Sequence, residues 1–214
     1  FSRIIRIEMP HYWAYLIVGI LPFQFVQNAI AEGSSAVRKN AGLIRKVYIP
    51  MEILVIAGVT VKLVEFLAQL AVAIALLAVA HHGEWFGFSA WRTLVILPWA
   101  VLLLYLFVLG VALPLAAWTV IYRDLEHMVT LALMMLLYLT PIFWSLSLLE
   151  GNRWKWAFML NPVMHFLDLF RGPLYWGTSC TLWTWVPAVF FAVTAFVGGY
   201  ALFDRSKHVL AEVV

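Results

Sequence analysis

The sequence predicts an all-α, polytopic membrane protein built as a helical bundle. Of its 214 residues, 64% are hydrophobic and only 12% are charged, a composition that soluble globular domains do not have. Several stretches without a charged residue reach the ~20 residues that a helix needs to cross ~30 Å of hydrocarbon. These stretches are uniformly apolar, which favours helices over the alternating strands of a membrane barrel.

Five stretches are long enough to cross a membrane. Four of them, residues 9–31, 93–122, 127–149 and 172–203, contain no Asp, Glu, Lys or Arg. The fifth, residues 51–80, is equally long but contains charged residues, among them Lys62 and Glu65. We therefore expect a single transmembrane domain over residues 1–214, with helices at about residues 11–31, 52–80, 93–121, 128–146 and 184–203.

Lys62 and Glu65 lie in the interior of the expected span at residues 52–80. Each would cost roughly 2.5–3.5 kcal/mol at the centre of a helix that faces lipid. Because they are three residues apart, they can lie on one helical face and form an ion pair. We expect this pair to face the bundle or a polar pathway.

The motif YRDLEH, residues 122–127, joins two expected spans almost without a linker. Arg123 and Asp124 therefore lie at the edge of the membrane. Two interpretations stay open, a solvated turn or a polar cluster that gates a pathway. In the second case, Arg123 and Asp124 would join Lys62 and Glu65 as gate or pathway residues.

The distribution of Lys and Arg predicts the orientation in the membrane. Arg38, Lys39, Arg45 and Lys46 are concentrated in one short loop beside two spans, so we place this loop and the C-terminus in the cytoplasm. Five spans then place the N-terminus on the outside. The sequence begins without an initiator methionine or a signal-peptide core, and we expect one further span before it, giving six in the intact protein.

A short amphipathic helix is predicted within this loop, at about residues 36–47. Ser34 or Ser35 is a suitable N-cap, and Pro50 ends the helical region. Such a helix would lie on the membrane surface among anionic headgroups or dock onto a soluble partner. Its apolar stripe comprises Val37, Ala41, Ile44 and Tyr48, whereas Arg38, Arg45 and Lys46 point elsewhere.

The external connection, at about residues 150–177, contains a second short helix. Asn161 followed by Pro162 is an N-cap with proline at the first helical position. The segment is too short to span, so we expect a re-entrant or interfacial helix. We expect His165 and Asp168 to form a hydrogen-bonded pair on its wet face, because no third metal ligand lies nearby. The apolar face comprises Val163, Phe166, Leu167 and Phe170.

Many of the 11 Trp, 8 Tyr and 15 Phe residues lie near the ends of spans, as expected for interfacial aromatic belts. A smaller set surrounds Pro141, where a helix is expected to bend near its external end. This set comprises Tyr138, Phe143 and Trp144. Their ring faces would suit stacking on the C–H faces of sugars or on an acyl chain.

Several classes of function are disfavoured. Basic minus acidic residues give 14 − 11 = +3, too small an excess to indicate nucleic-acid binding. Cys180 is the only cysteine, which excludes an internal disulfide and a cysteine-based metal site. The sequence has no phosphate-binding loop ending in Gly-Lys-Ser/Thr, no Gly-x-Ser-x-Gly elbow and no His-Glu-x-x-His motif. We expect no catalytic site, metal or cofactor in this chain, with any ATP bound by another chain.

Four motifs in this order resemble the permease subunits of type-2 ATP-binding-cassette exporters of the polysaccharide-export class, which move O-antigen, capsule or teichoic-acid chains. They are NAGLIRKVYIPMEIL (residues 40–54), YRDLEH (122–127), YLTPIFW (138–144) and LNPVMHFLDLFRGPLYWG (160–177). The resemblance covers essentially the whole chain. It departs at the start, where the family's N-terminal amphipathic helix and first span are not seen.

The resemblance implies a subunit in the inner membrane of a bacterium that pairs with a second copy and with two nucleotide-binding subunits, which hold ATP and magnesium. A polysaccharide or lipid-linked glycan would pass between the two permeases, surrounded by membrane lipid. The stretch around Asn161, Pro162, Phe166, Phe170 and Arg171 would be the external re-entrant helix. The coupling helix to the ATPase would comprise Val37, Arg38, Asn40, Ala41, Gly42, Leu43, Ile44, Arg45 and Lys46.

Two other functions compete with this interpretation. One is an integral-membrane glycan- or acyl-transferring enzyme that uses His165 and Asp168, or Asp124, and would be active without an ATPase partner. The other is a type-2 exporter of a drug or lipid, which would share every predicted helix and differ only in its cargo.

Overall fold

The protein is an all-helical bundle, which confirms the predicted fold class. The computed structural model describes residues 11–44, 46, 49–81, 90–122, 124–144, 158–178 and 180–213. In chain order the helices are α1 (Tyr12–Lys39), α2 (Ala41–Ile44), α3 (Met51–His81), α4 (Ala90–Ile121), α5 (Leu125–Leu139), α7 (Pro162–Arg171), the π-helix η2 (Gly172–Trp176) and α8 (Leu182–Val213).

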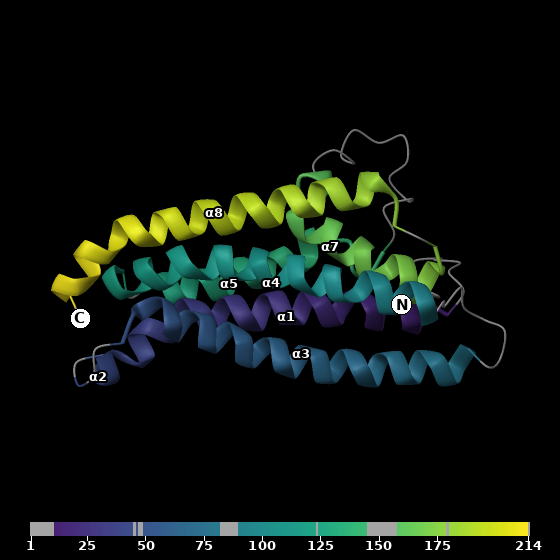
Figure 1. Ribbon diagram of the computed structural model, residues 1–214, viewed down its shortest axis with the longest axis horizontal. Helices are drawn as coiled ribbons and strands as arrows, with labels where there is room; N and C mark the ends of the chain where they lie inside the picture. Colours follow the sequence, from purple (N-terminus) through teal and green to yellow (C-terminus); the bar gives the residue numbers. More distant parts are fainter. Residues whose placement is uncertain are drawn as a thin grey trace.

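Four helices of the described chain, α1, α3, α4 and α8, are long and apolar enough to cross a membrane. They lie side by side with α1 and α4 in the centre, and α3 and α8 on opposite flanks (Figure 1). The most extensive contacts join α4 to α8 and α1 to α3 and α4. This arrangement produces one continuous apolar core whose largest fully buried side chains include Phe23, Phe66, Phe166, Phe170 and Phe203.

The two ends of the bundle carry different segments (Figure 1). One end, called the α2 end below, carries α2, the turn between α4 and α5, and the end of α8. The start of α1 lies at the opposite end, and α7 and η2 lie toward it. The loop at residues 40–50, the motif at 122–127 and the C-terminal residues therefore share one end, as the five-span topology requires.

α5 is shorter than predicted. The expected span at residues 128–146 is replaced by a helix that ends at Leu139 and has 15 residues, or about 22 Å of helix against ~30 Å of hydrocarbon. Pro141 explains the early end, because proline disfavours the helical conformation in the preceding residue. Thr140 is accordingly extended, with φ −96° and ψ 131°.

The helix predicted over residues 36–47 is wrong in its boundaries. α1 continues to Lys39, Asn40 interrupts the helix, and α2 is a separate four-residue turn. Ser34 and Ser35 are not N-caps, because their hydroxyl groups donate hydrogen bonds to the Ala31 carbonyl within α1 at 2.9 and 3.1 Å. Inside a helix, a serine hydroxyl commonly bonds to the carbonyl group three or four residues earlier instead of capping a helix. Arg45, Val47 and Tyr48 lie outside the described residues.

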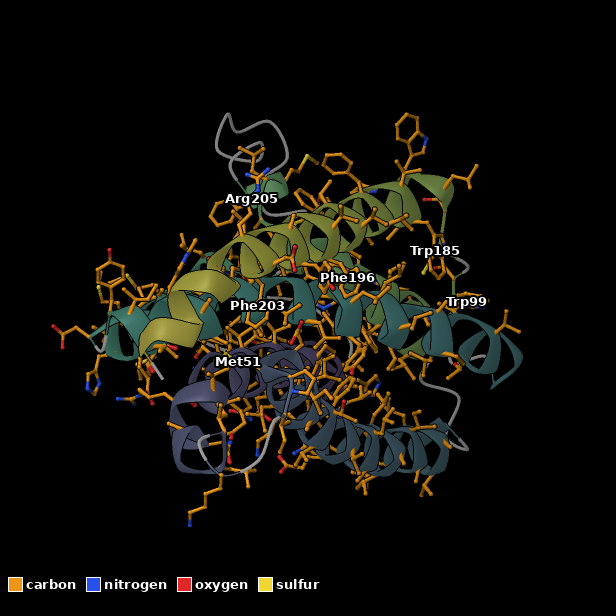
Figure 2. All side chains as sticks on the ribbon, turned by 60° about the vertical axis from the view of Figure 1, so that its left-hand side comes forward. Met51, Trp99, Trp185, Phe196, Phe203 and Arg205 are labelled. Carbon is orange, nitrogen blue, oxygen red and sulfur yellow. The ribbon has the colours of Figure 1, made fainter. Side chains whose placement is uncertain are left out.

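The contact between α4 and α8 depends on two glycines. A Cβ atom added to Gly199 would lie 1.8 Å from the Gly110 carbonyl oxygen, so only glycine allows the two backbones to approach this closely. Small residues at such crossings let membrane helices pack tightly. Figure 2 shows Phe196 and Phe203 on either side of this crossing, pointing from α8 toward α4.

Gly199→Ala is expected to destabilise the protein, whereas Gly198→Ala is a matched control. The first places a methyl group against the Gly110 backbone, and the second meets nothing within 4 Å. Overpacking of this kind costs about 1–3 kcal/mol or more. Thermal unfolding of the purified proteins in detergent should show a lower midpoint for Gly199→Ala only. Equal midpoints for the two variants would contradict the described helix crossing.

Candidate functional site

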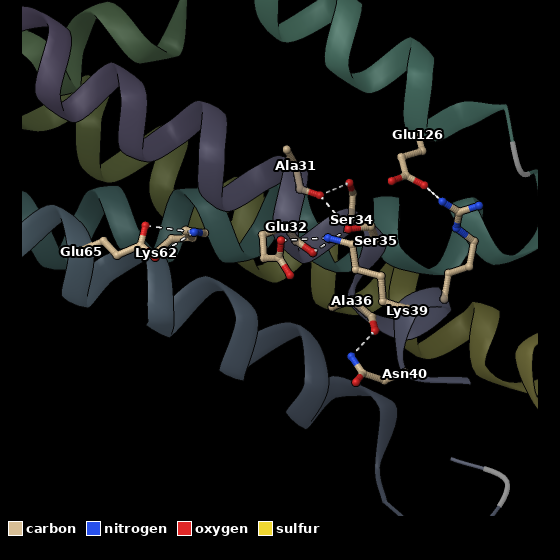
Figure 3. Close-up of polar contacts among 11 residues, drawn as sticks. Ala31, Glu32, Ser34, Ser35, Ala36, Lys39, Asn40, Lys62, Glu65 and Glu126 are labelled. Carbon is tan, nitrogen blue, oxygen red and sulfur yellow. Dashed lines mark hydrogen bonds and ion pairs between the residues drawn. The ribbon is translucent and has the colours of Figure 1, made fainter. Parts of the chain in front are cut away.

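An ion pair joins two segments at the α2 end. Arg38, in the last turn of α1, pairs through its guanidinium group with the Glu126 carboxylate in the first turn of α5 (Figure 3). Each charge also has the favourable sign for its helix end, because cations suit C-termini and anions suit N-termini. Lys39 pairs separately with Glu32 at 2.9 Å. The Arg38–Glu126 pair therefore ties the end of α1 to the start of α5.

The sequence prediction missed this ion pair. The sequence places Arg38 on the polar side of the predicted coupling helix and Glu126 in the turn YRDLEH, and it predicts no contact between them. A signal was available, since the predicted topology places residues 32–50 and 122–127 on the same side of the membrane with opposite charges at facing helix ends. Sequence separation hides such a contact until the helices are arranged in space.

The short helix α2 carries some of the exposed residues among the predicted coupling residues. Gly42 and Leu43 are exposed, Leu43 to 43%, and Lys46 beyond them is also exposed. Ile44 instead packs partly against the core, and Val37 is fully buried within α1. The apolar stripe from Val37 to Ile44 is therefore split between the interior of α1 and the surface turn α2.

Asn40 connects these two helices. Its backbone carbonyl accepts hydrogen bonds from Leu43 and Ile44 at 2.9 and 3.1 Å. Its side-chain amide donates to the Ala36 carbonyl at 2.8 Å (Figure 3). α2 is thus attached to the end of α1 by hydrogen bonds through a single residue.

The predicted gate residues do not form one cluster. Lys62 and Glu65 form the expected ion pair, with the ammonium nitrogen 2.8 and 2.9 Å from the carboxylate oxygens (Figure 3). They lie in the middle of α3, however, while Asp124 is an exposed residue before α5 at the α2 end. Arg123 lies outside the described residues. The Glu65 side chain is 49% exposed, so this pair faces outward from the described chain.

The short helix α7 begins as predicted. The Asn161 side chain accepts a hydrogen bond from the Val163 amide at 3.0 Å, with Pro162 at the first helical position. Its amide group also donates to the Thr140 hydroxyl at 2.8 Å, which ties α7 to the end of α5. The predicted apolar face is almost completely buried: Val163, Phe166, Leu167 and Phe170.

Arg171, at the end of α7, is a buried cation that is only 4% exposed. Its two terminal nitrogens donate to the carbonyl oxygens of Pro141 and Ile142 at 3.0 and 3.2 Å. Its guanidinium carbon lies 4.0 Å from the centre of the Tyr15 ring, a cation–π contact. These carbonyls follow the end of α5, where backbone acceptors have no partner within the helix.

Two tyrosines of α1 donate hydrogen bonds to the next two residues of the segment that follows α5. The Tyr12 hydroxyl donates to the Phe143 carbonyl at 2.6 Å, and the Tyr15 hydroxyl donates to the Trp144 carbonyl at 3.0 Å. Four consecutive carbonyl oxygens, from Pro141 to Trp144, therefore accept hydrogen bonds from side chains. We call this set of contacts the Arg171 cluster. It satisfies irregular backbone that lipid could not satisfy.

The aromatic residues near Pro141 lie in different environments. Tyr138 is 77% exposed on the outer face of α5. Phe143 and Trp144 are half-buried, and the Trp144 ring packs edge-on against Phe158. A role for the three rings in stacking on a glycan stays a prediction.

The structure does not show the predicted hydrogen bond between the side chains of His165 and Asp168, because His165 has a different partner. The Nε2 atom of His165 lies 2.8 Å from the Met159 carbonyl oxygen, and its ring stacks on Phe191. Burial raises the pKa of Asp168, while the nearby charges of Arg171 and His165 act in the opposite direction. Among the described residues, no group of three potential ligands is arranged to hold a metal ion.

Comparison with known proteins gives consistent findings. The family described as "ABC-2 type transporter" matches residues 2–175. Two O-antigen export system permease proteins RfbA of Klebsiella pneumoniae are 24% and 25% identical over 216 and 223 residues, covering all of this chain and 80% of each relative. RfbA of Myxococcus xanthus is 27% identical over 176 residues, covering 82% of this chain and 65% of the relative.

Arg171→Leu is expected to destabilise the protein by about 3–5 kcal/mol, because it leaves buried carbonyls without donors and Asp168 without its neighbouring cation. Arg171→Lys should recover only part of the loss, since an ammonium group lacks the planar fork of guanidinium. Tyr15→Phe should cost about 1 kcal/mol. Thermal unfolding measures these differences, with Arg205→Gln on the exposed end of α8 as the control. An Arg171→Leu variant as stable as Arg205→Gln would contradict this role.

Proposed function

Because this chain belongs to the ABC-2 type transporter family, we propose that it is the transmembrane subunit of an ATP-driven exporter that moves a polysaccharide or lipid-linked glycan across the cytoplasmic membrane of a bacterium. The multi-pass helical bundle supports the transport role. The cargo is inferred from relatives that are named as O-antigen export permeases.

ATP is bound and hydrolysed, in this proposal, by a partner subunit. The sequence has no loop of the Gly-x-x-x-x-Gly-Lys-Ser/Thr type that cradles phosphates. The chain therefore needs a surface through which a partner can move it. The α2 end supports this assignment, because it carries a short exposed turn directly attached to a long buried helix.

The orientation follows from the charges at the α2 end. Arg38, Lys39, Lys46 and Arg205 belong to segments at this end, and cytoplasmic segments carry an excess of Lys and Arg. We place the α2 end and the C-terminus in the cytoplasm, where an ATPase subunit can reach them. α7, η2 and the Arg171 cluster then lie toward the outer side.

The proposed mechanism passes from α2 into two helices. A push on α2 reaches α1 through the hydrogen bonds of Asn40. The same displacement reaches α5 through the Arg38–Glu126 ion pair. Both helices continue to the Arg171 cluster, where Tyr15 and the end of α5 contact the same guanidinium group. Movement on the cytoplasmic side can thus change the position of α7.

A second copy of the chain would complete the pathway. The outer faces of α3, α5 and α8 are apolar and exposed in the described chain, for example at Val64, Met135 and Val193. The Lys62–Glu65 pair lies on such a face, and facing lipid would be costly for it. We place this pair toward the second permease or the glycan pathway rather than toward lipid.

The competing enzymatic function gains no support from the geometry. Asp124 lies at the α2 end, away from α7, and His165 is engaged by a backbone carbonyl and a phenylalanine ring. Export of a drug or lipid fits the same helices, so direct measurement of cargo must separate it from glycan export.

Leu43→Asp is expected to abolish ATP-driven export while leaving the fold intact, because Leu43 is exposed on α2. Ile44→Asp is a less selective test, since Ile44 packs partly against the core. Gly198→Ala, which lies on α8 and outside α2, is the control, because its added methyl group meets nothing within 4 Å. The measurements are co-purification of the ATPase subunit and ATP-dependent glycan export into inverted vesicles. Unchanged export and assembly in Leu43→Asp would remove the coupling assignment.

Single charge reversals at Arg38 and Glu126 should uncouple ATP hydrolysis from export, and the double reversal should restore part of the coupling. The pair is partly exposed, with 42% and 27% of the two side chains accessible, so the stability change should stay within about 1 kcal/mol. The readout is the ratio of glycan exported to ATP hydrolysed in Arg38→Glu, Glu126→Arg and the double variant. Ratios equal to that of the wild type in all three variants would show that the pair transmits nothing.

A further inference from the structure

We propose that a pocket between α7, η2 and the start of α8 binds one neutral pyranose residue of the exported glycan. The inference rests on the proposed function for its ligand class, and on the pocket's lining for its position. The lining residues are Asp168, Arg171, Gly172, Trp176, Thr178, Cys180, Thr181 and Thr184, around a volume of about 240 Å³.

The local sequence explains how the pocket forms. Gly177 adopts a left-handed conformation with φ 60°, which glycine reaches without steric cost. The chain then reverses, and the Thr178 amide donates to the Gly172 carbonyl at 3.1 Å. A Cβ atom on Gly172 would lie 2.8 Å from the Cys180 sulfur. The reversal thus brings Thr178 and Thr181, and Thr184 in the first turn of α8, close to the end of α7.

The types of side chain point to a sugar. Trp176 is 49% exposed and offers a flat apolar ring against which the C–H face of a pyranose can pack. Thr178, Thr181 and Thr184 contribute hydroxyl groups that both donate and accept hydrogen bonds, and the Asp168 carboxylate accepts them. An aromatic ring beside several hydroxyl partners matches a ligand with one apolar face and a rim of hydroxyl groups.

The charges favour a neutral ligand over an anion or a cation. Arg171 and Asp168 interact electrostatically, so the positive and negative charges in the lining offset one another. Arg171 already donates to two carbonyl groups. A phosphate would meet the carboxylate of Asp168, and a cation would meet the guanidinium of Arg171. A hydroxyl-rich neutral ring avoids both repulsions.

The position gives the pocket a use in export. The helices that line it, α7 and the start of α8, lie toward the bundle end opposite α2 (Figure 1). Arg171 belongs both to the lining and to the Arg171 cluster. On the proposed orientation this end is the outer side, where a sugar residue would be held as the chain emerges. Because Arg171 contacts both the pocket and the segment after α5, occupancy of the pocket and movement of α5 act on the same side chain.

Cys180 provides the test, since it is the only cysteine in the sequence and lines the pocket. Burial raises the pKa of its thiol to about 11, so alkylation by N-ethylmaleimide at about pH 7.5, where lysine amines react little, should be slow and easily timed. The transporter, with its ATPase subunits, is placed in phospholipid nanodiscs without glycolipid or maltoside detergent. Intact mass of the permease then reports modification in the presence of methyl hexosides, including methyl glucoside, galactoside, mannoside and N-acetylglucosaminide, or of inorganic phosphate.

At least one methyl hexoside should slow alkylation about threefold or more at roughly 100 mM, and phosphate should not. Trp176→Ala and Thr184→Val should weaken the apparent affinity about tenfold and about threefold, whereas Trp176→Phe should retain most of it. Thr194→Val is the matched control, because this α8 hydroxyl lies outside the pocket and bonds to the Phe190 carbonyl. The near-isosteric Thr184→Val keeps the test valid if Trp176→Ala fails to fold.

Three results would overturn the pocket assignment: no protection by any hexoside, protection by phosphate equal to that by sugars, or protection that persists undiminished in both Trp176→Ala and Thr184→Val. Glycan export is measured on the same samples. ATP-driven export without sugar protection rejects the pocket and leaves the proposed function standing. The absence of ATP-driven glycan export from the wild-type complex rejects the proposed function itself.

Discussion

The half of this bundle opposite the α2 end depends on the pairing of Arg171 with the backbone that follows α5. Inside a membrane, carbonyl groups released by a broken helix must find protein donors. Arg171 supplies two of them, and Tyr12 and Tyr15 supply the others. The same guanidinium group fixes the end of α7. Pro141 ends α5, and one buried cation both satisfies the carbonyl groups released there and joins them to the short helix α7.

α1 and α5 each contact both functional regions of the chain. At the α2 end, Arg38 of α1 meets Glu126 of α5. Toward the other end, Tyr15 of α1 and the residues after α5 meet Arg171. Because helices are stiff, a displacement of α1 and α5 at the α2 end also moves the opposite ends of these helices. The contact between α4 and α8 is close because glycines lie at the crossing. We expect these two helices to keep their relative position while α1 and α5 move.

Local rules predicted much of the fold and some of the site. Hydropathy located the spans, helix capping located Asn161, and helical spacing predicted the Lys62–Glu65 pair. The predictions were wrong where two local structures were compatible with the sequence and tertiary packing determined which one forms. Ser34 is a residue type that suits an N-cap. Its neighbour Gly33 packs closely against α3 and α4, however, so Ser34 is buried and stays inside α1. The partners of Arg38 and Arg171 are distant in sequence, so no local pattern could identify them.

Two sets of accessible polar groups on this chain fit a transport role: the Lys62–Glu65 pair on α3 and the pocket beside Trp176. A monomer in lipid would expose the Lys62–Glu65 pair on α3 to hydrocarbon, where charged groups are costly. The pocket beside Trp176 likewise places a carboxylate and several hydroxyl groups where a polar ligand can reach them. The Lys62–Glu65 pair and the hydroxyl groups of the pocket are not required to hold the long helices together, since the core that joins these helices is apolar. Both are explained if the surroundings of these groups include a second protein surface and a hydroxyl-rich cargo instead of lipid alone.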